Sequence, residues 1–265
     1  MIQFRIDTIQ WLAEVASEGY KQIVTDIIDQ GTDDLIFRNI ATETAKGRHE
    51  EIVNCMIDKL LSDRELELDI FNDVVWNAAL GGHEQIVNDM IRTGVVDFNG
   101  IAVAAAKGGH EKMINDMIRL GADDFNHIAV TAAEQGREKI VSDMIRRGAE
   151  NFNNIAWWAA IKGYEQIVNS MIRIGANNFN EIANGAAYRG YDKIVNNMID
   201  RGANDFNGIA MEAANGGHEK IVDDMIQRGA DNIDQIAIEA ARAGYTGIVD
   251  DMIHRGACPP PLRET

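Results

Sequence analysis

Histidines at regular intervals are the residues in this sequence best suited to chemistry. His83 and His110 are 27 residues apart, and His49 and His218 hold the same place in the pattern. Converging histidines would predict a metal site or a proton-transfer site, because imidazole binds zinc and titrates near neutral pH. Other copies of the pattern carry a different residue at this place: Tyr20, Arg137, Tyr164, Tyr191 and Tyr245. Because each copy holds only one such residue, the side chains do not converge, and we interpret them as structural.

Other catalytic arrangements cannot be separated from the repeated pattern. The sequence contains no Ser-His-Asp or Cys-His arrangement, no phosphate-binding glycine loop and no isolated pair of carboxylates. The link at residues 121–126 offers few oxygen ligands for calcium and lacks the bidentate glutamate. Cys55 and Cys258 are the two cysteines, and we expect both to be free thiols. The sequence therefore predicts a protein that is not an enzyme and uses no cofactor or metal.

The regular spacing belongs to nearly the whole chain. Methionine recurs every 27 residues, at Met90, Met117, Met144, Met171, Met198, Met225 and Met252. A fixed period in this range indicates a supersecondary unit that stacks on copies of itself. Within residues 99–125, apolar residues at i, i+1, i+4 and i+5 occur twice, over 101–106 and 113–118. This spacing places them on one face of a helix, so each repeat is predicted to be two short helices.

The ends of the two helices carry recognisable signals. We expect Asn99 to be the N-cap of the first helix and Gly109 to take the left-handed position after it. Glu111 is expected to begin the second helix, and Arg119 and Gly121 to end it. The turn between the two helices is too short for the chain to cross over, so the helices within each repeat are predicted to be antiparallel.

The two-helix repeat pattern can be aligned with the sequence nine times. The sequence thus predicts an all-α, single-domain solenoid over residues 1–257, with an insertion near residues 60–69 and a short proline-rich tail at 258–265. Alanine pairs such as Ala159-Ala160 should let neighbouring helix backbones approach closely. We expect no β-structure in any copy.

The residues of one copy resemble a known family. Gly109-His110, then Met113-Ile114 and Met117-Ile118, then Gly121-Ala122-Asp123, is similar to the ankyrin repeat. The ankyrin unit has about 33 residues, and the residues missing here fall after Gly-Ala-Asp, where that family builds its β-hairpin. The Thr-Pro-Leu-His start is also absent. The chain therefore resembles a shortened, hairpin-less ankyrin variant of the kind that some giant DNA viruses carry.

A short link that ends in an aromatic residue replaces the hairpin. Its final residues are Phe37, Phe71, Phe98, Phe125, Phe152, Phe179 and Phe206, with Ile233 in the last copy. We interpret each ring as filling the gap between consecutive repeats, so that Phe125, Phe152 and Phe179 should be mostly buried. Stacking of these rings on a ligand is the alternative.

Charge limits the partners that the chain is expected to bind. A net charge of −17 argues against binding to the phosphate backbone of a nucleic acid, but it allows binding to a basic protein. Many acidic residues fall in the links and second helices. They are explained there by solvation of charged side chains and by the favourable interaction of carboxylates with helix N-termini. The alternative is that they form ridges that a basic partner recognises. The chain has no long apolar run and no basic leader, so we expect no membrane contact and a cytoplasmic location, in the host if the protein is viral.

The first helices vary most from copy to copy on the side opposite the apolar stripe. In residues 99–125 this side is Gly100, Val103, Ala104 and Lys107. Such variation on a constant framework is typical of a recognition surface. Apolar and aromatic anchors on it are Val130, Trp157, Trp158, Ile161, Tyr188 and Met211, and the polar rim is Glu134, Arg189 and Glu212. The alternative is that the first helices curve enough for these residues to pack on one another.

The sequence therefore predicts a non-enzymatic scaffold that binds a protein through the variable, concave face of its first helices. An acidic decoy or nucleic-acid mimic, which engages a basic protein through Asp-rich ridges, is the alternative. The last copy keeps a full apolar face with no evident cap, at Ile248, Val249, Met252 and Ile253. We therefore expect a monomer, or weak end-to-end association through this repeat.

Overall fold

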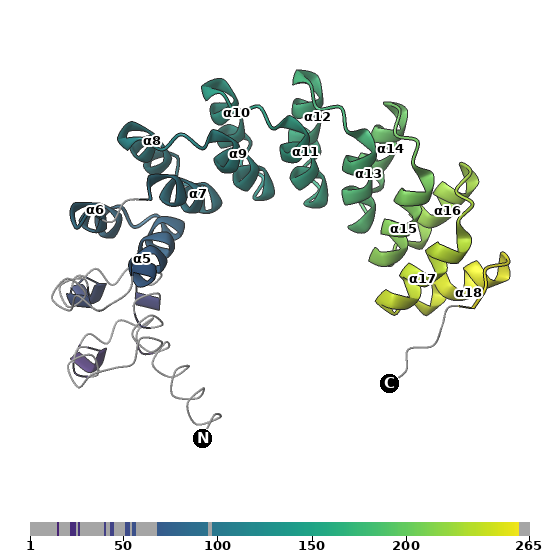
Figure 1. Ribbon diagram of the computed structural model, residues 1–265, viewed down its shortest axis with the longest axis horizontal. Coiled ribbons are helices and arrows are strands. Elements are labelled where there is room, and N and C mark those ends of the chain that lie inside the picture. The colour runs from purple at the N-terminus through teal and green to yellow at the C-terminus, as the bar shows by residue number, and fades with distance from the viewer. Residues whose placement is uncertain are drawn as a thin grey trace. The chain divides into compact units, whose positions relative to one another are not determined.

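The computed structural model describes residues 68–94 and 97–259, together with a few positions nearer the N-terminus: 15, 22–24, 26, 40, 43–44, 51–53 and 55–56. Contacts divide the chain into two compact units, Met1–Thr131 and Ala132–Thr265, and each is considered by itself. Among the described residues every regular element is an α-helix and none is a strand (Figure 1). The predicted all-α solenoid is thus confirmed. The first two predicted repeats lie largely outside the described residues.

The helices alternate regularly along the chain. In the N-terminal unit they are α5 (Leu68–Gly81), α6 (Glu84–Arg92), α7 (Phe98–Gly108) and α8 (Glu111–Leu120), and α9 (Phe125–Glu134) begins there and ends in the next unit. In the C-terminal unit they are α10 (Glu138–Arg147), α11 (Phe152–Ile161), α12 (Glu165–Ile174), α13 (Phe179–Tyr188), α14 (Asp192–Asp200), α15 (Phe206–Gly216), α16 (Glu219–Gln227), α17 (Ile233–Ala243) and α18 (Thr246–His254). In the N-terminal unit α5 packs on α6 and α7, and α7 packs on α8.

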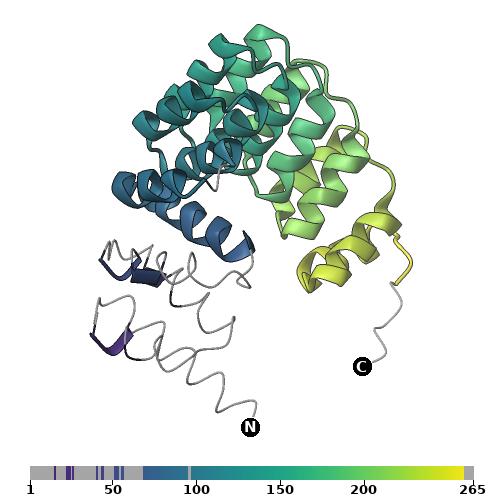
Figure 2. The ribbon, with the colours of Figure 1, turned by 60° about the vertical axis from the view of Figure 1, so that its left-hand side comes forward.

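The C-terminal unit arranges its helices in two rows. The first helices of the repeats, α11, α13, α15 and α17, pack directly on one another (Figure 1). Each also packs on the second helix of its own repeat, which is α12, α14, α16 or α18. Successive second helices make few contacts with each other, and Figure 2 shows the same two rows from another side. The unit is therefore tighter along its first helices than along its second helices.

Side-chain size explains the difference between the rows. The first helices meet through alanine pairs, and in α11, α13 and α15 these are completely buried: Ala159, Ala160, Ala186, Ala187, Ala213 and Ala214. Alanine lets two helix backbones come close. The second helices contribute longer side chains to the core, such as Ile194, Val195 and Met198 in α14, which are at most 1% exposed. These longer residues fill the space between the rows.

Most of the predicted helix ends are confirmed, and one is wrong. Gly109 follows α7 with a φ of 88°, and α8 begins at Glu111 and ends just before Gly121. The N-cap of α7, however, is Asp97, whose side chain accepts a hydrogen bond from the backbone N–H of Gly100 at 2.9 Å. Asn99 lies inside the helix. The prediction failed because Asp97 and Asn99 are both good capping residue types, and the chain enters the helix two residues earlier.

The asparagine at this position instead joins consecutive repeats. In α13, the Oδ1 atom of Asn180 accepts hydrogen bonds from the backbone N–H groups of Asn204 and Asp205, at 2.8 and 3.1 Å. The equivalent residues that do the same are Asn99, Asn153 and Asn207. Each bond crosses to the link that leads into the next repeat. We call this series the asparagine ladder.

The recurring histidines and tyrosines form a second ladder. The ring of Tyr191 lies against Gly163, the turn glycine of the preceding repeat, because a Cβ added there would be 2.6 Å from the ring. The imidazole Nε2 of His110 lies 2.9 Å from the backbone oxygen of Leu80, and that of His218 lies 3.2 Å from the oxygen of Tyr188. For these copies the structure supports the interpretation of the position as structural.

The irregular parts of the chain are described only in part. Residues 60–67 of the predicted insertion lie outside the described residues, whereas Leu68 and Asp69 belong to the first turn of α5. In the C-terminal tail, the backbone N–H of Cys258 donates to Asp234 at 2.7 Å, and residues 260–265 lie outside the description. No described helix is long and apolar enough to cross a membrane.

The link aromatics are partly enclosed. Phe125, Phe152 and Phe179 are each half-buried and form the first residue of their helix. The ring of Phe152 approaches Gly175, since a Cβ there would lie 3.7 Å from its Cδ2 atom. The ring thus lies near the end of the second helix of its own repeat.

Candidate functional site

The predicted site residues fall on both units. Val130 belongs to the N-terminal unit, where it is half-buried on α9. The other predicted residues belong to the C-terminal unit, on or just after its first helices: Glu134, Trp157, Trp158, Ile161, Tyr188, Arg189, Met211 and Glu212. Of these, Tyr188 and Arg189 are exposed and the rest are half-buried. We call the solvent-accessible side of α11, α13, α15 and α17 the first-helix face.

The predicted recognition positions are not all accessible. In α7, Val103 and Ala104 are 3% and 0% exposed, although both were expected to face away from the core. Gly185 and Gly208, at related positions in later repeats, are also buried. The close packing of first helices covers residues on the edges of the apolar stripe. Only part of each first helix therefore remains available to a partner.

The two tryptophans differ in their surroundings. Their rings meet edge to face, with centroids 5.0 Å apart and an interplanar angle of 78°. Trp157 and Ile161 reach across to α13, because a Cβ added to Gly185 would lie 3.0 Å from Trp157 Nε1 and from Ile161 Cγ1. Trp157 thus fills the space that Gly185 leaves. This contact supports, for Trp157 and Ile161, the alternative that these residues pack within the array, yet both remain half-buried rather than enclosed.

Cationic and aromatic groups adjoin at the end of α13. Tyr188 is 38% exposed, and the guanidinium carbon of Arg189 lies 5.2 Å from the centre of its ring. This distance is within the range of a cation–π interaction. Lys162, directly after α11, forms an ion pair with Glu134 at the end of α9, with 3.5 Å between Nζ and Oε1.

Two glutamates occupy the same position in consecutive first helices. Glu212 lies on α15 and Glu239 lies on α17. Burial raises the pKa of the Glu212 carboxyl above its ordinary value, and the neighbouring Glu239 carboxylate raises it further. The Oε1 atom of Glu239 accepts hydrogen bonds from Gln235 Nε2 and Arg242 Nη1, both at 2.8 Å. Sequence reasoning identified Glu212 but not Glu239, whose proximity depends on the stacking of the helices.

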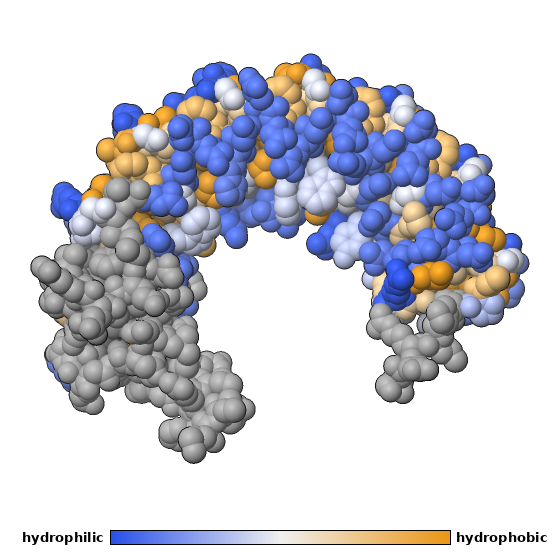
Figure 3. Space-filling model, in the orientation of Figure 1, coloured by the Kyte–Doolittle hydropathy of each residue, from blue (hydrophilic) through white to orange (hydrophobic). Residues whose placement is uncertain are grey.

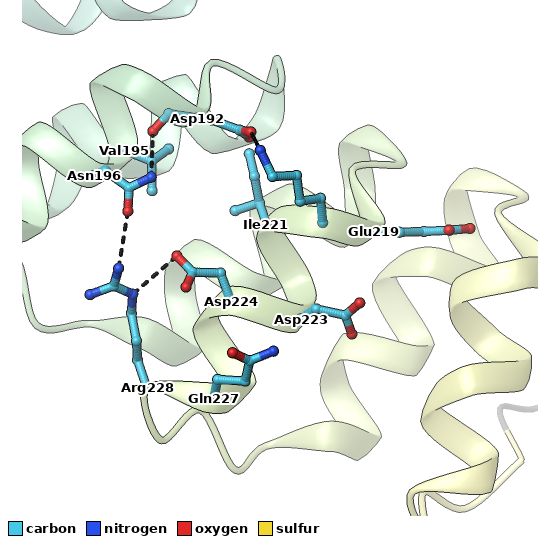
Figure 4. A pocket seen from close by; sticks show the side chains of 10 residues that line it. Asp192, Val195, Asn196, Glu219, Ile221, Asp223, Asp224, Gln227 and Arg228 are labelled. Atoms are coloured by element: carbon cyan, nitrogen blue, oxygen red, sulfur yellow. Dashed lines mark hydrogen bonds and ion pairs between the residues drawn. The ribbon is translucent and has the colours of Figure 1, made fainter.

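The opposite side of the C-terminal unit contains grooves between second helices. The groove between α14 and α16 has a volume of about 610 Å³ and is lined by charged residues over a floor that includes Val195 and Ile221 (Figure 4). Its charges largely pair with one another. Lys220 bonds to Asp192, and Arg228 donates to Asp224 at 3.0 Å and to Asn196 at 3.1 Å. The sequence did not predict these grooves, because the wide spacing of second helices is a property of the stack.

Similar pairing continues along the second helices. Arg255 donates to Asp223 at 2.6 Å and to Asp251 at 2.8 Å, and thereby links α18 to α16. On the visible face of the C-terminal unit, Figure 3 shows hydrophilic residues interspersed with smaller apolar areas. Several carboxylates of the second helices are thus paired with the chain's own arginines.

Comparison with known proteins gives no assignment. No protein-family model matches the sequence, and no curated protein matches it. What the chain binds is therefore inferred from its own residues. Within the described part of the chain, no group of three or more His, Cys, Asp and Glu side chains is placed to hold a metal ion. The first-helix face instead combines aromatic, apolar, cationic and carboxylate side chains, which suits non-covalent recognition.

Proposed function

We propose that this chain is a protein-interaction scaffold, built from shortened ankyrin-like repeats, which binds a partner through its first-helix face. The observation that carries the proposal is the group of partly accessible aromatic residues at Trp157, Trp158 and Tyr188. Large aromatic side chains that remain accessible on a rigid surface are frequent anchors of protein interfaces. The polar residues around them supply a rim.

The division between constant and variable positions supports this role. The asparagine ladder and the ring–glycine contacts recur from repeat to repeat and hold the stack together. At the position of Trp158, by contrast, the following repeats have Gly185, Glu212 and Glu239. A framework that repeats while this surface changes is what selective binding requires.

A variant pair tests the proposal. A protein partner is first captured with the intact chain in a pull-down. Trp158→Ala should weaken binding of that partner by about 2 kcal/mol, or roughly thirtyfold, while circular dichroism shows unchanged helical content. We choose Trp158 because Trp157 also packs on Gly185, so its removal would disturb the stack. Trp76→Ala is the matched control, since Trp76 is a half-buried tryptophan on a first helix of the other unit. Equal weakening by the two variants would contradict the proposed site.

The acidic-decoy alternative rests on a different observation. The last two second helices each carry two adjacent aspartates, which are Asp223 and Asp224 on α16 and Asp250 and Asp251 on α18. Partner binding through them should weaken steeply with salt, whereas an aromatic-anchored face should show a shallow dependence. A salt titration of the dissociation constant separates the two. A cytoplasmic location, and a monomer or weak end-to-end association through the last repeat, remain part of the proposal.

A further inference from the structure

The last repeat has an apolar surface that is covered in the repeats before it. Val249 on α18 is half-buried, whereas the described residues at its position in earlier repeats are at most 2% exposed. These counterparts are Val24, Val53, Val87, Ile114, Val141, Val168, Val195 and Val222. Ile253, one turn further along α18, is exposed. We call the side of α18 that carries Val249 and Ile253 the Val249 face.

The first repeat is uncovered at a different position. Ile23 is 42% exposed, whereas the described residues at its position in later repeats are at most 4% exposed. These counterparts are Ile52, Ile86, Met113, Ile140, Ile167, Ile194, Ile221 and Ile248. The adjacent Val24 is completely buried, so this helical segment is covered on one side and open on the other. We call the open side the Ile23 face.

Inside the array, residues at these two positions belong to one junction. The groove between α16 and α18 is lined by Val222 from the first of these helices and by Ile248 from the second, and both are buried. A residue at the valine position thus faces the following repeat, and a residue at the isoleucine position faces the preceding one. The Val249 face and the Ile23 face are therefore the two halves of the contact that joins consecutive repeats.

The turn glycine of the last repeat is also uncovered. The ring of Tyr245 lies against Gly217, the turn glycine of the preceding repeat, whereas a Cβ added to Gly244 would meet nothing within 4 Å. In the first repeat the ring position of the sequence is Tyr20, which lies outside the described residues. The first repeat therefore carries the type of side chain that covers this glycine position in other repeats.

We propose that the Val249 face of one copy of this chain packs on the Ile23 face of a second copy, in the register that joins consecutive repeats. This inference rests on the end-to-end association included in the proposed function, and it specifies the partner, the two faces and the register. Burial of aliphatic side chains that are accessible in the single chain favours the contact. Because the two faces differ, a dimer retains one free face of each kind and can add further copies.

Polar residues near the junction agree with this register. Between α14 and α16, Asp192 bonds to Lys220 of the next repeat. The last repeat has Thr246 at the place of Asp192, and the first repeat has Gln22 at the place of Lys220. Stacking the first repeat of one copy on the last repeat of another therefore brings two uncharged residues together here. The contact leaves no charge of this position buried without a partner.

A symmetric contact between two Val249 faces is disfavoured by charge. Asp250 is exposed and Asp251 is half-buried, and both directly follow Val249, so this contact would bring like charges of two copies close together. In the proposed register this pair of aspartates comes from only one copy. The net charge of −17 on each copy still opposes association, so added salt should strengthen the contact.

Sedimentation of the intact chain measures the association directly. We expect the weight-average mass to rise above that of a monomer as the concentration increases from the micromolar to the millimolar range. The mass should rise further with added salt, because screening lowers the repulsion between acidic copies. A mass that stays monomeric throughout, or an association that moderate salt disrupts, would overturn the proposal.

Two variants each block one face. Ile23→Glu and Val249→Glu should each weaken the association at least about tenfold, because a glutamate buried in an apolar contact is costly. Ile174→Glu is the matched control, since Ile174 is an exposed isoleucine at the end of α12 in an internal repeat, and it should retain the association. Circular dichroism verifies that each variant folds. Ile253→Glu, which changes an exposed residue of the same face, replaces Val249→Glu if that variant loses helical content.

A mixture of the two blocked variants tests the register. The Ile23→Glu chain retains its Val249 face, and the Val249→Glu chain retains its Ile23 face. An equal mixture should therefore form one-to-one dimers and no larger species. A dimer of the Ile23→Glu chain alone would indicate contact between two Val249 faces, and a dimer of the Val249→Glu chain alone would indicate contact between two Ile23 faces. Either result would overturn the proposal.

These outcomes are separate from the test of the first-helix face. Ile23→Glu and Val249→Glu should still bind the partner whose binding Trp158→Ala weakens, and Trp158→Ala should still associate end to end. A monomeric chain that binds the partner would refute this inference and leave the scaffold role intact. Head-to-tail association together with partner binding that does not depend on Trp158 would support this inference and refute the aromatic anchor.

Discussion

The side-chain oxygen of Asn207 accepts a hydrogen bond at 2.9 Å from the backbone N–H of Asp231, which lies 24 residues further along the chain. The same oxygen accepts from the next N–H, at Asn232, also at 2.9 Å. These N–H groups precede α17 and have no partner within their own helix. Each asparagine of the asparagine ladder therefore supplies a hydrogen-bond acceptor to the backbone N–H groups at the start of the next repeat. Successive repeats are joined by directional polar bonds as well as by the apolar core.

Removing one rung should destabilise the array measurably. Asn180→Ala should lower the free energy of unfolding by about 0.5–2 kcal/mol, because the N–H groups of Asn204 and Asp205 lose their acceptor. Both of those residues are exposed, so water replaces part of the lost bonding. Denaturant unfolding followed by circular dichroism measures the change.

Asn180→Asp is the control for this prediction. Asp234 holds the equivalent position in the last described repeat, and its carboxylate accepts from the N–H of Cys258 at 2.7 Å. An aspartate therefore keeps the acceptor, and we expect a smaller loss than with alanine. Equal losses for both variants would show that the rung contributes little.

Two glycines allow the contribution of ring contacts to be isolated. Gly163 and Gly244 have the same place in the inter-helix turn, with φ of 80° and 89°. The ring of Tyr191 lies against Gly163, whereas a Cβ on Gly244 would meet nothing within 4 Å. Alanine at either site adds strain of roughly 1–2 kcal/mol from the left-handed backbone. Gly163→Ala should be the more destabilising, since Tyr191 must also move; thermal unfolding of both variants tests this, and equal shifts would contradict it.

The sequence predicted the helical array because its signals are local and repeated. A 27-residue period, apolar stripes and turn glycines such as Gly109 determine where helices begin and end, and the structure confirms most of these positions. The role of Asn99 was predicted wrongly. An asparagine near a helix start suits an N-cap, and its actual partners, Asp123 and Asp124, are distant in sequence. Bonds between repeats require the stacking geometry.

The site was less predictable for a related physical reason. Whether Val103 or Trp157 is accessible depends on how closely neighbouring first helices pack, and the sequence does not specify that distance. One useful signal was present and was missed. Comparison of equivalent positions shows that Glu239 has Gln235 and Arg242 beside it, whereas Glu212 does not. Repeat proteins permit such comparisons without any relative, because each copy serves as a reference for the next.

The link aromatics should stabilise each repeat from a half-buried position. Phe152→Ala should cost about 3 kcal/mol, the lower end for a buried phenylalanine, because its ring is only half-buried and lies near Gly175. Phe152→Ile is the conservative control, since Ile233 serves at this position in the last repeat and is also half-buried. We expect its cost to be clearly smaller in denaturant unfolding. If Phe152→Ala lowers the free energy of unfolding by no more than an ordinary surface substitution does, a structural role for the link aromatic is contradicted.

The raised pKa of Glu212 predicts a specific pH dependence of stability. Burial, and then Glu239, favour the protonated carboxyl in the folded state, so the folded state binds more protons than the unfolded state between the ordinary and the raised pKa. The free energy of unfolding must therefore fall as pH rises through that interval. Glu212→Gln removes the ionisation, so its stability relative to wild type should increase across the same interval. Glu239→Gln should reduce the effect without abolishing it, because burial remains the larger cause. Denaturation midpoints over a series of pH values measure this difference, and a Glu212→Gln variant that stays parallel to wild type would show that the carboxyl titrates normally.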